Sequence, residues 1–247
     1  GAEAGRREAP PQEERGPPTA TTTDRSDCSE ENDTDSDADS GHRFLTEETV
    51  LIFDWDDTVF PSSWVQEQGL RLDGESSLSE PQREELSELA RLAAETFGLA
   101  KQLGTVVLVT NAERGWIELS CAKFMPALQP SLENVKLLSA RTEYETTAIS
   151  SPFEWKLKAF ESEIGRLFLG GLDGQRRKNV VSLGDSAHER EALIHATAHL
   201  PNCRTKSLKF VERPALEQLR KQHALVARCF RKIVHHDGNL DLCIRAL

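Results

Sequence analysis

The sequence of 247 residues has no apolar run approaching the ~20 residues that a membrane-spanning helix needs. Its N-terminus also lacks the apolar core of a secretory signal peptide, although a targeting segment lost from the start stays an open alternative. The five cysteines show no CxxC or CxxH spacing, which indicates reduced thiols in a reducing compartment. These absences predict a cytoplasmic or nuclear protein with no membrane partner.

Basic residues are also few, and the negative charge is concentrated at one end. The net charge is -11, and residues 1–40 contain 4 basic and 12 acidic residues, so the rest of the chain is close to neutral. No basic surplus remains to bind a nucleic-acid backbone, and we expect no nucleic-acid partner. Residues 1–44 are rich in Pro, Ser, Thr, Asp and Glu and poor in large apolar side chains, which predicts a disordered acidic tail.

A second region, 45–247, has the pattern of a folded domain. Short runs rich in Val, Leu and Ile recur without clean alternation, as in strands that are buried on both faces of a parallel sheet. Segments of helical periodicity separate them, and no internal repeat is visible. The pattern predicts an α/β domain with a doubly wound, Rossmann-like parallel sheet of about five strands, helices on both faces, and a C-terminal helix. The strand runs are "TVLIF", "TVVLV", "NVKLL", "NVVSLG" and "SLKFV".

Polar residues follow three of these apolar runs where the strands should end. The first run leads into Asp54, Asp56 and Asp57, the second into Thr110 and Asn111, and the fourth into "GDSAHERE". Parallel strands bring their carboxyl ends to one edge of the sheet, where ligands bind. Carboxylates gathered there repel one another unless a cation lies among them, and hard oxygen donors favour Mg²⁺.

The same residues resemble the motifs of the haloacid dehalogenase (HAD) superfamily. "DWDDT" resembles its motif I, "VLVTN" is similar to motif II, and "SLGDSAHE" is similar to motif IV, in the family's order. The resemblance covers roughly residues 48–212. It implies a Mg²⁺-dependent phosphomonoester hydrolase that works through an aspartyl-phosphate intermediate.

The resemblance also implies roles for individual residues. Asp54 would be the nucleophile that attacks phosphorus, and Asp56 would serve as general acid and then general base. The hydroxyl of Thr110 and the backbone N–H of Asn111 would hold the phosphoryl oxygens.

The implied metal ligands come from motifs I and IV. Asp54, the main-chain carbonyl of Asp56, and Asp185 would bind Mg²⁺, while Glu189 would bind the ion or lie in its outer shell. The motif III lysine, a further phosphate-binding residue, has two candidates in "SPFEWKLKAF". Lys156 lies nearer the start of the helix than Lys158 and is the better candidate.

The second aspartate distinguishes reaction types within the family. Asp56 stands where the family's ATPases carry Thr, which favours a phosphatase or phosphomutase. Asp57 is interpreted as solvated or as a turn cap, and Trp55 as a packing residue beneath the loop.

Too few residues follow motif I or the third strand to form the cap domain that usually selects substrates in this family. A capless domain suits a bulky substrate such as a phosphoprotein. Two alternatives stay open: a small-molecule phosphatase whose flap restricts access, and a non-catalytic phosphate-binding scaffold. The sequence does not predict the oligomeric state.

Overall fold

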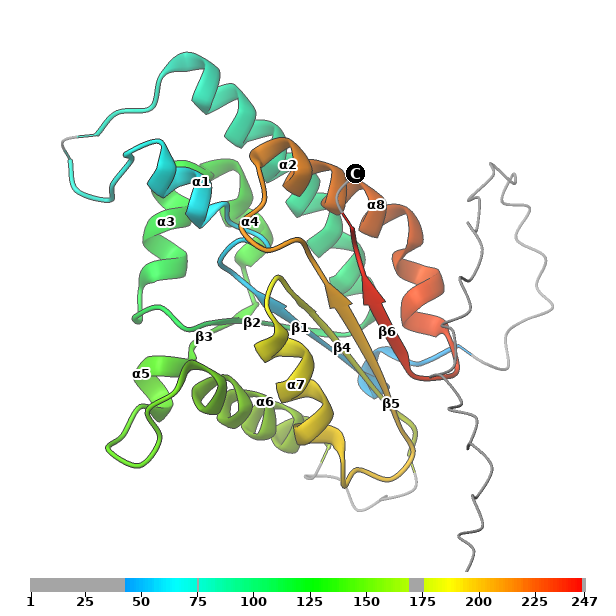
Figure 1. The fold of residues 1–247 in the computed structure, drawn as a ribbon. Coiled ribbons are helices and arrows are strands. Elements are labelled where there is room, and N and C mark those ends of the chain that lie inside the picture. Colours follow the sequence, from blue (N-terminus) through cyan, green and yellow to red (C-terminus); the bar gives the residue numbers. More distant parts are fainter. Residues whose placement is uncertain (1–42, 75, 169–175, 246–247) are drawn as a thin grey trace, which may run out of the picture. The chain divides into compact units, whose positions relative to one another are not determined.

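The computed structural model describes residues 43–74, 76–168 and 176–245 (Figure 1). The predicted acidic tail, 1–44, therefore lies outside the described residues except for Arg43 and Phe44. Phe44 is buried, and the charged ends of Arg177 and Lys206 lie 4.6 Å and 4.5 Å from the centre of its ring. The folded domain thus includes Phe44, one residue before the predicted boundary.

A single sheet forms the centre of the domain, and all its strands are parallel. The order is β3-β2-β1-β4-β5-β6, so the chain builds one half outward from β1 and then the other half on its opposite side. This is the doubly wound arrangement that the sequence predicted. The strands are β1 (Thr49–Asp54), β2 (Thr105–Thr110), β3 (Lys136–Ser139), β4 (Lys178–Gly184), β5 (Cys203–Lys209) and β6 (Leu240–Cys243).

The sheet has six strands, and the prediction of about five is corrected by β6. This short strand pairs with β5 at the edge of the sheet, and most of its residues are exposed. It therefore lacks the continuous apolar run by which the buried strands were recognised.

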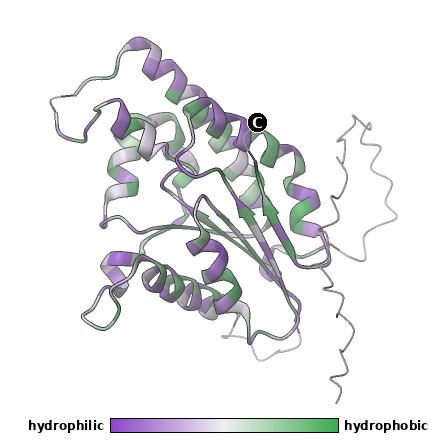
Figure 2. Cartoon of the chain, viewed as in Figure 1, coloured by the Kyte–Doolittle hydropathy of each residue, from purple (hydrophilic) through white to green (hydrophobic). Residues whose placement is uncertain are grey.

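Helices cover both faces of the sheet, which gives three layers (Figure 1). Leu51 and Phe53 of β1 point to one layer, and Val50 and Ile52 point to the other. The first layer contains α2 (Glu80–Leu103), α3 (Trp116–Phe124) and α8 (Leu216–His235), and the second contains α5 (Ala140–Tyr144), α6 (Pro152–Phe168) and α7 (Ala187–Thr197). The shorter helices are η2 (Thr46–Glu48), α1 (Ser62–Glu67), η3 (Pro126–Leu128) and α4 (Gln129–Leu132). In Figure 2 the large helices alternate between hydrophobic and hydrophilic residues, as helices with one buried face do.

The longest helix, α2, begins and ends where the sequence signals predict. The hydroxyl of Ser79 accepts a hydrogen bond from the backbone N–H of Gln82, and Pro81 lies in the first turn. Gly104 follows the last turn, where a Cβ would lie 2.5 Å from the carbonyl oxygen of Thr49. Only glycine allows α2 to lead so closely into the sheet.

No separate cap domain interrupts the described part of the chain. Between β1 and α2 lie only α1 and its loops, and between β3 and α6 lie only α5 and a loop. Among the described helices, none combines the length and apolar content needed to cross a membrane.

Candidate active site

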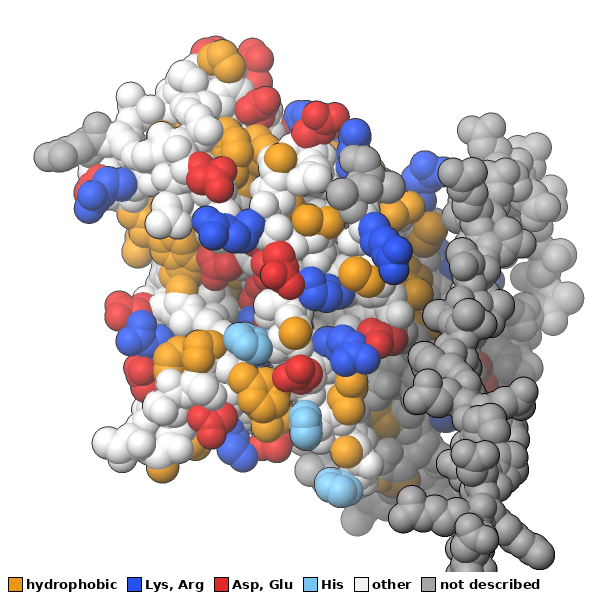
Figure 3. All heavy atoms as spheres, viewed as in Figure 1, with side chains coloured by type: hydrophobic (Ala, Val, Ile, Leu, Met, Phe, Trp, Pro, Cys, Tyr) orange, Lys and Arg blue, Asp and Glu red, His pale blue; other side chains and the backbone are white. Residues whose placement is uncertain are grey.

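The carboxyl ends of β2, β1 and β4 lie side by side, with β1 in the middle. The order of the strands reverses between β1 and β4, and open parallel sheets bind ligands outside the strand ends at such a point. Asp54 and Thr110 are the last residues of β1 and β2, and Asp185 directly follows β4. Acidic and basic side chains are visible side by side over this part of the surface in Figure 3.

Lys156 of α6 joins two acidic residues below this edge. Its Nζ donates hydrogen bonds to Oδ1 of Asp54 and, over 2.6 Å, to Oε1 of Glu189. The side chains of Lys156, Asp54 and Glu189 are only 3%, 6% and 5% exposed, so water screens these charges little. Burial alone would lower the pKa of Lys156, but the two carboxylates raise it above its ordinary value and keep the ammonium group charged.

The other candidate lysine lies elsewhere. Lys158 is exposed on α6 and pairs with Glu161 of the same helix at 2.7 Å. Two residues along a helix point in very different directions, so only one of the two lysines can face the sheet edge. Of the two lysines, Lys156 is the one that contacts the candidate site.

Glu189 uses both of its carboxylate oxygens in the described structure. While Oε1 accepts from Lys156, Oε2 accepts from the backbone N–H of Ser186 at 3.1 Å and from its hydroxyl at 2.6 Å. Burial tends to raise the pKa of Glu189, but the Lys156 charge and these hydrogen bonds outweigh burial and lower it. These contacts fit an outer position better than direct metal binding.

Asp56 is oriented by two donors from different elements. The hydroxyl of Thr110 donates to Oδ2 at 2.7 Å, and the indole N–H of Trp116 donates to Oδ1 at 2.8 Å. Asp56 itself is half-buried. Its carboxyl group is therefore held in a defined direction at the surface of the site, as a group that transfers protons must be.

The predicted phosphate-binding pair lies at the end of β2, with Thr110 as its last residue and Asn111 directly after it. Thr110 is buried, and its hydroxyl accepts from the backbone N–H of Ala112 at 3.0 Å while it donates to Asp56. Asn111 donates from its side-chain nitrogen to the carbonyl oxygen of Pro152 at 3.2 Å. Its Oδ1 is buried with no hydrogen-bond partner in the described structure. Asn111 thus ties the strand end to the start of α6, from which Lys156 extends.

The remaining acidic residue of motif I has a structural contact. Asp57 accepts from the backbone N–H of Ser63 at 2.8 Å and from its hydroxyl, and it has a φ of 52°. It is buried, so of its two predicted roles it takes the turn cap and is not solvated. Trp55 is also buried, and its indole N–H donates to Ser120 Oγ at 3.0 Å, which agrees with a packing role.

The carboxylates at the site carry more negative charge than Lys156 neutralises, which favours binding of a further cation. Burial, followed by repulsion from Glu189, Asp56 and Asp185, raises the pKa of Asp54 well above its ordinary value, although Lys156 opposes this. Burial, followed by repulsion from Glu189 and Asp57, raises the pKa of Asp185 to about 7. One lysine therefore does not neutralise the carboxylates around it.

The oxygen donors at the site are of the type that Mg²⁺ prefers, but few carboxylate side chains are available to bind the ion. Within residues 43–74, 76–168 and 176–245, no three His, Cys, Asp or Glu side chains are gathered as a metal site. Two carboxylates, those of Asp54 and Asp185, and the main-chain carbonyl of Asp56 are the expected set. Mg²⁺ commonly binds proteins through one or two carboxylates and keeps several waters, so such a set is sufficient.

Sequence reasoning missed the part played by Trp116. Trp116 is half-buried, and its N–H reaches Asp56 from the first turn of α3. A buried or half-buried Trp needs a partner for its single donor, and this need was the available signal. The pairing itself depends on the fold, because 60 residues separate the two side chains.

Comparison of the chain with protein-family models, with curated proteins and with solved structures found no match.

Proposed function

We propose that the protein is a Mg²⁺-dependent phosphomonoester hydrolase of the HAD type that forms an aspartyl-phosphate on Asp54. The observation that supports this most strongly is the pairing of two differently placed aspartates at the reversal point of the sheet. Asp54 is buried against Lys156, whereas Asp56 is half-buried and held by Thr110 and Trp116. This difference supports a nucleophilic role for Asp54 and an acid–base role for Asp56.

In the first step, a carboxylate oxygen of Asp54 attacks phosphorus and the ester P–O bond breaks. The leaving oxygen takes the proton of the Asp56 carboxyl group and departs as an alcohol. Lys156 favours the ionised form of Asp54 through its charge. Two of its three N–H donors are used in the described structure, so the third is available for a phosphoryl oxygen.

In the second step, water attacks phosphorus and gives a proton to the Asp56 carboxylate. The bond between phosphorus and Asp54 breaks, inorganic phosphate leaves, and both aspartates return to their starting states. Asp56 can act first as acid and then as base because the first step leaves it deprotonated. Thr110 and Trp116 keep it in one direction through both steps. When bound by Asp54, Asp185 and the Asp56 carbonyl, Mg²⁺ would neutralise charge on the phosphoryl oxygens.

The substrate is proposed to be a phosphoprotein or another bulky phosphate ester. The support is the absence of a cap domain in the described chain, since only α1 and its loops lie between β1 and α2, and only α5 and a loop lie between β3 and α6. A small metabolite would not be enclosed on its far side, whereas a large substrate supplies its own cover.

A panel of phosphopeptides and phosphorylated metabolites, assayed with and without Mg²⁺, tests the proposal. We expect hydrolysis by the wild type that is lost in Asp54→Asn and after chelation of the metal. Glu88→Gln makes the same chemical change on the exposed side of α2 and should retain activity. Equal inactivity of wild type and Asp54→Asn across the whole panel would reject the enzyme and favour a phosphate-binding scaffold.

A further inference from the structure

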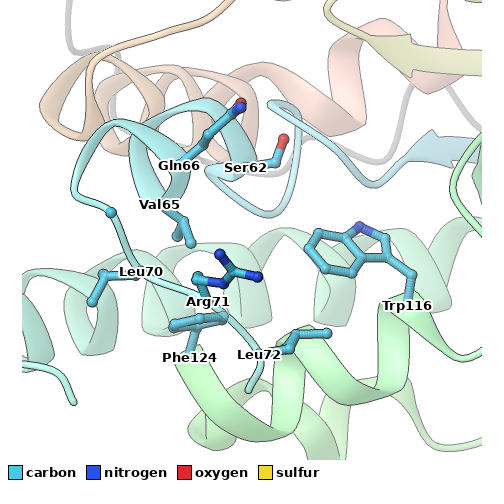
Figure 4. A pocket seen from close by; sticks show the side chains of 9 residues that line it. Ser62, Val65, Gln66, Leu70, Arg71, Leu72, Trp116 and Phe124 are labelled. Carbon is cyan, nitrogen blue, oxygen red and sulfur yellow. The ribbon is translucent and has the colours of Figure 1, made fainter. Parts of the chain in front are cut away.

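A pocket of about 620 Å³ lies next to the candidate site, between α1, the loop that follows it, and α3 (Figure 4). Its walls are mainly apolar. Val65 and Phe124 are buried, Leu72 is half-buried, and Trp116 provides one side. Pockets of this size commonly hold a small ligand or a large side chain.

Trp116 connects this pocket to Asp56. Its N–H donates to the Asp56 carboxylate at 2.8 Å, while its indole ring lines the pocket. In Figure 4 the six-membered ring points toward Val65 and Arg71, and the nitrogen lies on the edge away from Leu72. An ester oxygen within hydrogen-bond reach of Asp56 is therefore also next to the indole.

The indole is held firmly in this position by other aromatic rings. The Phe60 ring lies edge-on to Trp116 and tilted against Phe124, with 5.8 Å and 5.7 Å between ring centroids. Trp55 stacks on Phe60 with 5.8 Å between the centroids. Phe60 is fully buried, so it fixes two of the lining side chains, Trp116 and Phe124, from the core. A wall fixed by packing can select a shape, because its side chains do not move aside freely.

We propose that this pocket receives the leaving group of the substrate and selects phosphate esters of ring-bearing alcohols, such as phosphotyrosine. The proposal rests on the hydrolase activity proposed above and names the substrate class of that site. The leaving group must extend away from Asp56 once its oxygen accepts the proton, and the surface that begins there is apolar and aromatic. A ring packs favourably against the indole and Phe124.

The charges of the pocket agree with this substrate class. Among the described residues that line the pocket, Arg71 alone is charged, and its Nε lies 2.8 Å from a carboxylate oxygen of Asp73. A polyhydroxylated sugar would find few partners along these walls and would lose hydrogen bonds to water. A second hollow, beside Arg114 and Arg141, is lined by paired charges and lacks a contact with Asp56 in the described structure.

Benzyl phosphate and ethyl phosphate provide a direct test, because their alcohols are of similar acidity and differ in the ring. We expect Leu72→Gln to lower kcat/KM for benzyl phosphate roughly tenfold while kcat/KM for ethyl phosphate changes less than about twofold. Gln66→Leu, on the exposed side of α1, adds apolar surface to the pocket and should raise the preference for benzyl phosphate. Ile194→Gln, an exposed apolar residue of α7, is the matched control and should leave the ratio unchanged.

Three outcomes separate this proposal from the one on which it rests. Hydrolysis of both esters with a ratio that none of the pocket variants changes would overturn the pocket and leave the hydrolase standing. Absence of hydrolysis in the wild type would overturn both. A changed ratio supports the pocket, and a comparison of a phosphotyrosine peptide with free phosphotyrosine and with the matching phosphoserine peptide then shows whether the ring comes from a protein.

Discussion

A single indole N–H links Asp56 to the neighbouring pocket. Trp116→Phe keeps an aromatic wall but removes this donor, so Asp56 is held by Thr110 alone. A less well-placed acid slows the departure of poor leaving groups most, because good leaving groups need little protonation. We expect kcat/KM, which reports the steps up to loss of the leaving group, to fall roughly tenfold for ethyl phosphate and less than about twofold for p-nitrophenyl phosphate.

A loss on ethyl phosphate alone would show that Trp116 positions Asp56, whereas a general disturbance of the site would slow both substrates. Trp64→Phe on α1 makes the same substitution away from Asp56 and should change neither rate. An equal loss on both substrates in Trp116→Phe would indicate a packing role only.

The two lysines of α6 form a matched pair for the next prediction. Lys156→Met should abolish measurable hydrolysis and lower the free energy of unfolding by about 3–5 kcal/mol, since it leaves Asp54 and Glu189 buried without their cation. Lys158→Met, at an exposed pair, should change stability by less than about 1 kcal/mol and activity by less than about twofold.

Unfolding in urea measures the first effect, and the variant Lys156→Met/Asp54→Asn provides its control. Removing one of the stranded carboxylates should restore part of the lost stability. Equal stability of the two single lysine variants would contradict the buried triad.

At the residue scale, the sequence indicated which side chains gather but not how they pair. Asp54, Thr110 and Asp185 could be located because each ends or follows a recognisable strand run. The hydrogen bond from Thr110 to Asp56 and the bond from Trp116 to Asp56 could not, since they depend on loop paths that no periodicity encodes.

At the scale of the elements, the junction of β4 and α7 holds Glu189 against Lys156. Gly184 ends the strand, and a Cβ there would lie 2.3 Å from Cγ and 2.6 Å from Cδ of Glu189. Gly184→Ala should therefore displace Glu189, lower the free energy of unfolding by about 1–3 kcal/mol, and reduce hydrolysis.

A second glycine provides the control for that substitution. Gly98 lies within α2, and no atom comes within 4 Å of a Cβ placed there. Gly98→Ala should stabilise the protein by up to about 1 kcal/mol, because alanine favours the helix. Urea unfolding of both variants measures the contrast, and equal effects would contradict a role for close packing at Gly184.

The main elements were predictable because buried parallel strands and capped amphipathic helices leave strong local patterns. Ser79 and Pro81 are sequence signals for the start of α2, and Gly104 is a signal for its end. The exposed edge strand β6 was not predicted, because its own residues do not form a buried apolar run. It is a strand because it pairs with β5.

Across the whole molecule, a buried histidine connects α8 to the loop of motif I. His223 donates from Nε2 to the carbonyl oxygen of Thr58 at 2.9 Å and contacts Thr96 Oγ1 at 3.2 Å through Nδ1. Burial lowers the pKa of His223 from 6.5 to about 4. The unfolded chain therefore binds the proton more readily between these two pH values, so stability falls as the pH decreases through this range.

His223→Gln tests this contribution. Between pH 6.5 and about 4, the free energy of unfolding of the wild type should fall by about 3 kcal/mol more than that of the His223→Gln variant. Urea unfolding at several pH values measures the difference, with the exposed His199→Gln as control. If the free energy of unfolding fell equally with pH in the wild type and in His223→Gln, His223 would not be the cause of the acid sensitivity.

The central claim is that Asp54 becomes phosphorylated, and trapping the acyl phosphate tests it most directly. Asp56→Asn should slow attack by water while p-nitrophenyl phosphate, with its good leaving group, still phosphorylates the protein. Borohydride reduces an acyl phosphate to an alcohol, so peptide mass spectrometry after reduction should find homoserine at position 54. Homoserine at another aspartate, or none at position 54 while nitrophenol is released, would contradict the account.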